Sequence, residues 1–157
     1  MTGFRARMSL AALALLLAAP AWAGTESVPL RDIADLLSAH GCADVRSLEA
    51  EGDHLKIRAR RADGRVIDAV ADLRDRSVAE KTADLGPFVR YAAPAPSQMG
   101  FGELMALVES KWPASTLSEV KLHGGAYEVH LRTAAGSPVG ILVDVTTRVV
   151  RTYHSID

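Results

Sequence analysis

Six residues of this 157-residue chain carry side chains that commonly bind transition metals: His40, Cys42, His54, His123, His130 and His154. Imidazole and thiolate groups bind zinc or copper, usually from close pairs such as Cys-x-x-Cys or His-x-x-x-His. Only His40 and Cys42 lie this close in the sequence, and the other four are scattered. A zinc or copper site therefore stays open as an alternative function, and it would require three of these residues to converge in space.

Nucleophilic catalysis has weaker support than metal binding. It needs Ser or Cys beside a His that an acid orients, and His154-Ser155-Ile156-Asp157 has these types only at the C-terminus, where chains fray. Asp72 and Asp144 occupy equivalent places in a repeat described below and could form a carboxylate pair. A residue that ends a strand in both copies is better explained as shaping a turn through backbone hydrogen bonds. We predict no catalytic residues, no enzyme activity and no cofactor.

The first 23 residues have the pattern of a cleaved export signal. Arg5 and Arg7 precede the apolar residues 10–19, and Ala21-Trp22-Ala23 is a small-x-small cleavage site. Residues 10–19 are too short a run for a transmembrane helix, and no later segment is long and apolar enough to span a bilayer. We expect cleavage after Ala23 and a soluble, exported protein, with the periplasm as its location.

The net charge and the cysteine content exclude some classes of function. The chain has 18 Lys and Arg against 19 Asp and Glu, and loss of Arg5 and Arg7 with the signal makes it more acidic. A nucleic-acid-binding protein shows a basic surplus on one face, so we exclude this class of partner. The lone Cys42 cannot form a disulfide within the chain, and its place beside Gly41 at a helix end favours a small buried side chain over a reactive thiol.

The pattern of Leu30–Glu80 recurs in Phe101–Thr152: an amphipathic helix, then three or four short alternating strands. The matched apolar positions of the two helices are Leu30 with Phe101, Ile33 with Leu104, and Leu37 with Val108. We predict an α+β fold of two repeats, each with one helix packed on its own three- to four-stranded antiparallel sheet. The predicted segments are a signal peptide (1–23), repeat 1 (24–84), a Pro-containing linker (85–97) and repeat 2 (98–157).

Alternation of apolar and polar residues also predicts how the strands pair. In the first copy a three-residue loop, Ala62-Asp63-Gly64, puts Ala59 opposite Ile67 on the inner face. The same register puts Arg58 opposite Asp68 on the outer face, where opposite charges stabilise an antiparallel pair. The outer face of the first copy is therefore expected to be neutralised by its own ion pairs.

The order of these elements resembles the PepSY module of bacterial exported proteins and metallopeptidase propeptides. The matching stretches run from Leu55-Lys56-Ile57 through Asp63-Gly64 to Ala71-Asp72, and from Tyr127-Glu128-Val129 through Gly136 to Val143-Asp144. The family usually has a Gly-containing turn after the Asp, where this chain has Arg76 and Arg148. The resemblance implies a helix packed on an antiparallel sheet and a role in protein–protein interaction. For many members that role is held to be inhibition or chaperoning of an exported peptidase.

The outer face of the second copy is the predicted partner-binding surface. The loop Ala134-Ala135-Gly136 puts Glu128 opposite Leu142 and His130 opposite Gly140. An exposed Leu and a bare Gly beside charged neighbours would leave room for a side chain of another exported protein, such as a peptidase. The predicted partner-binding residues are Glu128, His130, Arg132, Leu142 and Gly140.

Overall fold

The computed structural model describes residues 28–42, 44–81, 95 and 97–153. The predicted signal peptide, most of the predicted linker and His154 lie outside these residues. Within them the chain forms α1 (Leu30–Ala39), β1 (Asp44–Glu51), β2 (His54–Arg60), β3 (Val66–Asp72), β4 (Ser77–Lys81), α2 (Phe101–Lys111), β5 (Thr116–His123), β6 (Ala126–Arg132), β7 (Pro138–Asp144) and β8 (Val150–Tyr153).

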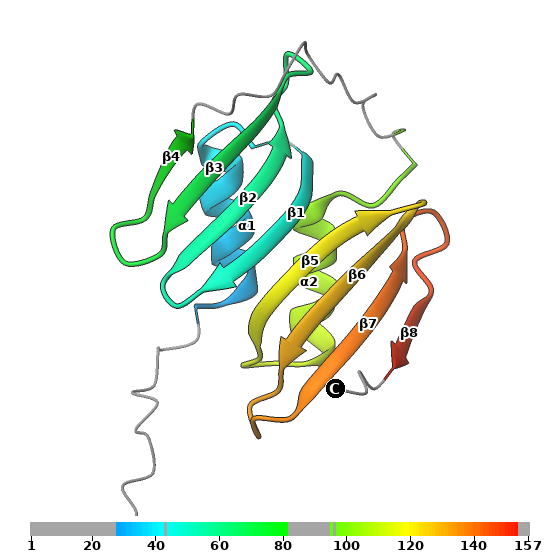
Figure 1. Cartoon of the computed structure of the whole chain (residues 1–157). Coiled ribbons are helices and arrows are strands. Elements are labelled where there is room, and N and C mark those ends of the chain that lie inside the picture. Colours follow the sequence, from blue (N-terminus) through cyan, green and yellow to red (C-terminus); the bar gives the residue numbers. More distant parts are fainter. Residues whose placement is uncertain (1–27, 43, 82–94, 96, 154–157) are drawn as a thin grey trace, which may run out of the picture.

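All the strands belong to one eight-stranded antiparallel sheet, in the order β4-β3-β2-β1-β5-β6-β7-β8 (Figure 1). The predicted α+β fold of two repeats, each with a separate three- to four-stranded sheet, is therefore wrong: the fold is mainly β. The two halves of the sheet join where β1 pairs with β5, through Ser47 with Lys121, Leu48 with Val120, and Glu49 with Glu119. In a separate small sheet β1 and β5 would each be an open edge, and their pairing satisfies the backbone groups that such edges leave free.

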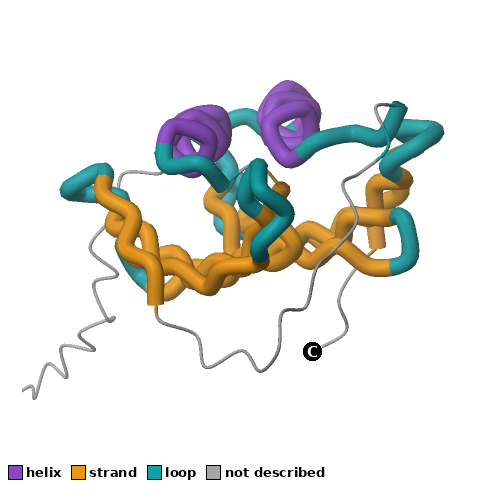
Figure 2. Tube along the Cα trace, turned by 90° about the horizontal axis from the view of Figure 1, so that it is seen from above, coloured by secondary structure: helices purple, strands orange, loops and turns teal. Residues whose placement is uncertain are grey.

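In the described part of the chain both helices lie side by side on one face of the sheet, and the opposite face carries no helix (Figure 2). We call the helix-covered face the inner face and the other the outer face. The apolar stripes of the helices meet inward side chains of the strands, so Leu37 of α1 and Leu104 of α2 are fully buried with Leu48 and Val120. These four side chains belong to one continuous core that runs beneath both helices.

The predicted hairpin registers are confirmed. In the β2–β3 hairpin Ala59 lies opposite Ile67, and Arg58 lies opposite Asp68. The Arg58 guanidinium donates to both carboxylate oxygens of Asp68, at 2.8 and 3.0 Å. In the β6–β7 hairpin the predicted pairs on the outer face also form, including His130 opposite Gly140. Alternation and a Gly turn therefore predicted which side chains share the outer face.

The turns that follow β3 and β7 share one construction. The Asp72 carboxylate accepts hydrogen bonds from the backbone N–H groups of Arg74 (2.8 Å) and Asp75 (3.2 Å). Asp144 likewise accepts from the backbone of the two Thr residues that follow Val145, at 2.9 and 2.7 Å. These backbone hydrogen bonds hold the pKa of both carboxyl groups below the ordinary value. The structural role predicted for the two Asp residues is confirmed.

Arg76 and Arg148 occupy the turn positions where the PepSY pattern has Gly. Both have left-handed backbone conformations, with φ of 52° and 60°. An L-residue other than Gly is strained there, and each side chain makes a compensating contact with the first turn of a helix. Arg148 pairs with Glu103 of α2 at 3.0 Å, and Arg76 lies 3.8 Å from Asp32 of α1. Anionic residues are favourable at helix N-termini. The two ion pairs connect the turn after β3 to α1 and the turn after β7 to α2.

Candidate partner-binding surface

The last three strands place a hydrogen-bonded cluster on the outer face. Glu128 and His130 are alternate residues of β6 and therefore point to the same side. The Tyr153 hydroxyl donates to Glu128 Oε1 at 2.6 Å, and its oxygen lies 3.1 Å from His130 Nε2. His130 Nε2 is also 3.1 Å from Glu128 Oε1, and the His130 and Tyr153 rings meet edge to face with centroids 6.0 Å apart. We call Glu128, His130 and Tyr153 the polar triad.

The polar triad perturbs the acidity of two of its members. The pKa of Glu128 is held below its ordinary value, first by the hydrogen bond from Tyr153 and then by the contact with His130. Burial raises the pKa of Tyr153 to about 12, and the hydrogen bond to Glu128 acts in the same direction. Glu128 is therefore a carboxylate near neutral pH, and Tyr153 keeps its proton. Both shifts follow from the hydrogen bond between Tyr153 and Glu128 together with burial.

Gly140 is not the bare position that the sequence predicted. It is buried, and a Cβ atom built on it would lie 2.6 Å from Cε2 and 2.7 Å from Cζ of Tyr153. The space next to Gly140 is thus filled by the ring of Tyr153 from β8, which pairs with Gly140 across the strands. The ring occupies the space that a side chain at position 140 would fill, so this position requires glycine. A side chain from a partner could enter there only by displacing the ring.

Leu142 and Arg132 remain accessible on this surface. Leu142 is 38% exposed and lies between Glu128 of β6 and Arg151 of β8. Arg132 is exposed at the end of β6, where its guanidinium lies 3.4 Å from the carbonyl oxygen of Gly136. A partner would therefore meet an apolar side chain, an arginine and the outer rim of the polar triad.

Sequence reasoning missed Tyr153. A fourth strand was expected only as an option in each copy, and its pairing with the preceding strand was not worked out. Pairing the last strand with β7 by the same alternation would have put Tyr153 opposite Gly140. The register that pairs Leu142 with Arg151 also pairs Gly140 with Tyr153. The signal was a Gly in a strand interior, which often marks the close approach of another group.

The candidate metal ligands are dispersed in the described part of the chain, where no three His, Cys, Asp or Glu side chains form a group able to hold a metal ion. His40 Nδ1 lies 2.9 Å from the carbonyl oxygen of Leu36, and His54 pairs with Asp72. Cys42 is buried, and burial raises the pKa of its thiol against the opposing effect of the nearby Arg61 guanidinium. His130 belongs to the polar triad, and His123 is exposed at the end of β5.

A hollow of about 350 Å³ lies on the outer face and is lined by residues of β1 to β5. Its charged lining comprises Glu49, Lys56, Arg58, Asp68, Lys81, Glu119 and Lys121. Arg58 pairs with Asp68, and Lys121 pairs with Glu119, so most of this charge is balanced within the protein. The hollow is therefore a less distinctive surface than the one formed by the last three strands.

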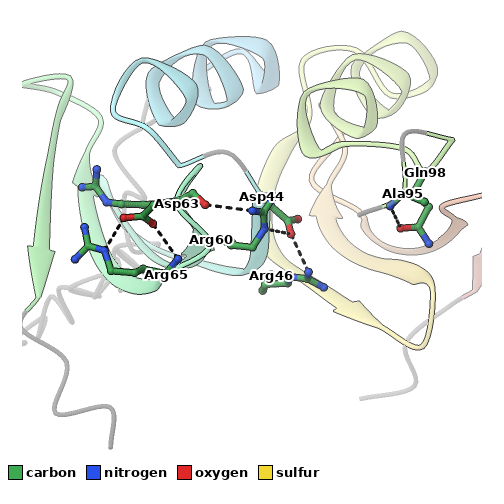
Figure 3. Close-up of polar contacts among 8 residues, drawn as sticks. Asp44, Arg46, Arg60, Asp63, Arg65, Ala95 and Gln98 are labelled. Atoms are coloured by element: carbon green, nitrogen blue, oxygen red, sulfur yellow. Dashed lines mark hydrogen bonds and ion pairs between the residues drawn. The ribbon is translucent and has the colours of Figure 1, made fainter. Parts of the chain in front are cut away.

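A second polar cluster is buried at the start of β1 (Figure 3). The Asp44 carboxylate is 4% exposed, 2.8 Å from Arg46 Nη2 and 3.5 Å from Arg60 Nε. A buried charge is strongly unfavourable without such partners. Asp44 also contributes to raising the pKa of the buried Tyr127 to about 12, after burial itself. The two ion pairs balance the charge of Asp44, although Asp44 Oδ2 and Arg60 Nε make no hydrogen bond within the described residues.

Comparison with known proteins leaves the family open. No protein-family model matches the chain, and no curated protein matches it. Among solved structures, similarity is found to a candidate lipoprotein of Clostridium difficile 630. The match has a TM-score of 0.38 and 14% sequence identity, and it covers 83% of this chain and 95% of that chain. In the described residues, neither helix is long and apolar enough to cross a membrane.

Proposed function

We propose that this protein is a non-enzymatic exported protein that binds another exported protein through the outer face of β6–β8. Export to the periplasm is supported by the signal-peptide pattern of residues 1–23. A binding role is supported by an outer face that no helix of the described residues covers and that displays an apolar side chain among polar ones.

Leu142 is the observation that carries this proposal. Among the described residues only Leu142 and Val149 are large hydrophobic side chains that remain exposed; Leu142 lies in β7 and Val149 directly precedes β8. Leu142 lies beside the polar triad, whose hydrogen bonds hold its members in place before any partner arrives. Binding sites gain affinity when their polar groups are already ordered, because less entropy is lost on association. An apolar anchor with a rigid polar rim is the usual anatomy of a protein interface.

The resemblance of the two sequence copies to PepSY modules identifies an exported peptidase as the first class of partner to test. A pull-down from exported extract with the chain that begins at Gly24, read by mass spectrometry, would identify the partner. A parallel sample with a chelator distinguishes the alternative function. Enrichment that requires a metal ion would favour the zinc or copper site over the interaction proposal.

The surface is then tested on the purified partner. Leu142→Asp should weaken binding at least tenfold, because it places a charge where an apolar contact is expected to be buried. The matched control is Val70→Asp, which changes the corresponding position of β3 on the same face of the first half. Circular dichroism should show that both variants fold. Equal affinity of wild type and Leu142→Asp would exclude this surface as the binding site.

A further inference from the structure

Strand β8 is an edge of the sheet, and one of its two sides has no partner strand in the described part of the chain. The backbone groups on that side follow from the β7–β8 pairing. The N–H of Asp144 donates to the carbonyl of Val149 at 3.1 Å, so the backbone groups of Val149 point toward β7. In an antiparallel strand successive residues direct their N–H and C=O groups to opposite sides. Arg151 and Tyr153 therefore face β7, while Val150 and Thr152 present their N–H and C=O groups at the open edge.

The opposite edge of the sheet carries more charge than β8, whose one charged side chain is Arg151. Strand β4 carries Glu80 and Lys81, and Glu80 forms an ion pair with Arg61. Charged side chains on an edge strand discourage pairing with other chains. The residues Val149 to Tyr153 favour β structure and include no carboxylate and no proline. The open side of β8 is thus the less protected edge.

The side chains of this edge specify the chemistry of a strand that would pair with it. Val149, the residue before β8, is 49% exposed. Arg151 is exposed on the outer face, its charge acts on the nearby Asp144 carboxyl group, and within the described residues it forms no ion pair. Opposite charges facing each other stabilise an antiparallel pair, and like charges destabilise it. The edge therefore favours an extended segment with an acidic residue opposite Arg151 and apolar residues on either side.

We propose that the partner of this protein adds an extended acidic strand to the open side of β8, hydrogen-bonded to Val150 and Thr152. Strand addition of this kind takes its affinity from the main chain and its specificity from alternate side chains. The inference rests on the proposed function, since it says how the bound protein would be held. In a second copy, symmetric pairing centred on Arg151 would put two arginines opposite each other, so that register is unfavourable.

The test uses the chain from Gly24, labelled with ¹⁵N, and two synthetic peptides as probes. One peptide is acetyl-Thr-Val-Thr-Glu-Thr-Val-Thr-amide, and the other has Lys in place of Glu. Addition of the Glu peptide should slow the hydrogen exchange of the Val150 and Thr152 amides while leaving the already bonded amide of Arg151 unchanged. Thr152→Pro should abolish binding, because proline removes an outward N–H without breaking a bond to β7. Thr152→Val keeps that N–H and is the matched control.

Reversing the charge of the peptide or of Arg151 distinguishes specific strand pairing from nonspecific binding. Wild type should bind the Glu peptide roughly two- to fivefold more tightly than the Lys peptide, and Arg151→Glu should reverse the order. Absence of protection at Val150 and Thr152 with 2 mM of the Glu peptide would overturn the proposal. Protection that appears without peptide and grows with protein concentration would also overturn it, because the occupant would then be a second copy. Neither result depends on Leu142→Asp, so failure of strand addition and failure of the proposed function are distinguishable.

Discussion

Replacement of Gly140 by alanine tests the link between β8 and the polar triad. The added methyl group would lie 2.6 to 3.0 Å from three atoms of the Tyr153 ring. Carbon atoms do not approach so closely, so the ring must move away. Its hydroxyl would then lose the 2.6 Å hydrogen bond to Glu128. The structure thus predicts that the smallest possible side chain at this position detaches Tyr153 from the outer face.

The expected cost follows from two opposing effects. A hydrogen bond to a charged group contributes roughly 1.5–3 kcal/mol, and partial exposure of Glu128 puts this bond at the lower end. Alanine in place of glycine in a regular element returns about 0.5–1 kcal/mol through backbone entropy. We expect Gly140→Ala to lower the free energy of unfolding by about 1 kcal/mol. Gly102→Ala is the matched control, because Gly102 is exposed in α2 with nothing near its added Cβ, and it should stabilise by about 0.5–1 kcal/mol.

Urea unfolding at pH 7, followed by circular dichroism, measures both variants. A double-mutant cycle with Tyr153→Phe isolates the mechanism. If alanine displaces the ring, removal of the hydroxyl should cost little in the Gly140→Ala background and about 1–2 kcal/mol in the wild type. The pKa of Tyr153, about 12 in the wild type, should fall toward 10 in Gly140→Ala, as read from the NMR shifts of the Tyr153 ring. Equal stability of the two glycine variants together with an unchanged Tyr153 titration would refute this reasoning.

Three further predictions concern the core and the turns. Leu104→Ala, which truncates a fully buried side chain of α2, should cost about 2–5 kcal/mol in urea unfolding; a cost below about 1 kcal/mol would contradict its place in the core. The pKa of Asp144 is lowered in the folded state, so its stabilising effect is present above about pH 4 and is lost as pH falls through the folded-state pKa. Asp144→Asn should therefore be less stable than wild type at pH 7, and the gap should close in unfolding curves taken between about pH 5 and pH 2. Arg148→Ala keeps the left-handed backbone and loses the pair with Glu103, whereas Arg148→Gly also removes the strain and should be about 1 kcal/mol more stable than the alanine variant; equal stability would show that this turn is not strained.

Local pattern predicted the hairpins and the outer-face pairs but not the sheet as a whole. Apolar alternation determines which way a side chain points, and the Gly turns determine register, so His130 opposite Gly140 could be predicted from neighbouring residues. Alternation does not predict which strand pairs with the edge of β1 that β2 leaves open. The pairing of Leu48 with Val120 joins residues far apart in the sequence, and for that reason two separate sheets were expected.

The candidate surface was predicted only in part for a related reason. A glycine between apolar residues is compatible with empty space and with a covered backbone, and only the position of Tyr153 distinguishes the two. Arg76 and Arg148 were recognised as departures from the family pattern. Their left-handed conformations could not be predicted, since the helix acids that accept them lie more than forty residues earlier in the chain.

The junction of β1 with β5 also determines how the chain folds. Every other pair of neighbouring strands is a hairpin, closed by a short loop, whereas the junction rests on three residue pairs that enclose a long stretch of sequence. Loop closure makes such contacts late and slow to form. A folding chain can therefore complete its hairpins while β1 and β5 still have free edges. At that stage β5 of another chain offers β1 the same contacts, so high protein concentration during refolding favours exchange of halves between two molecules.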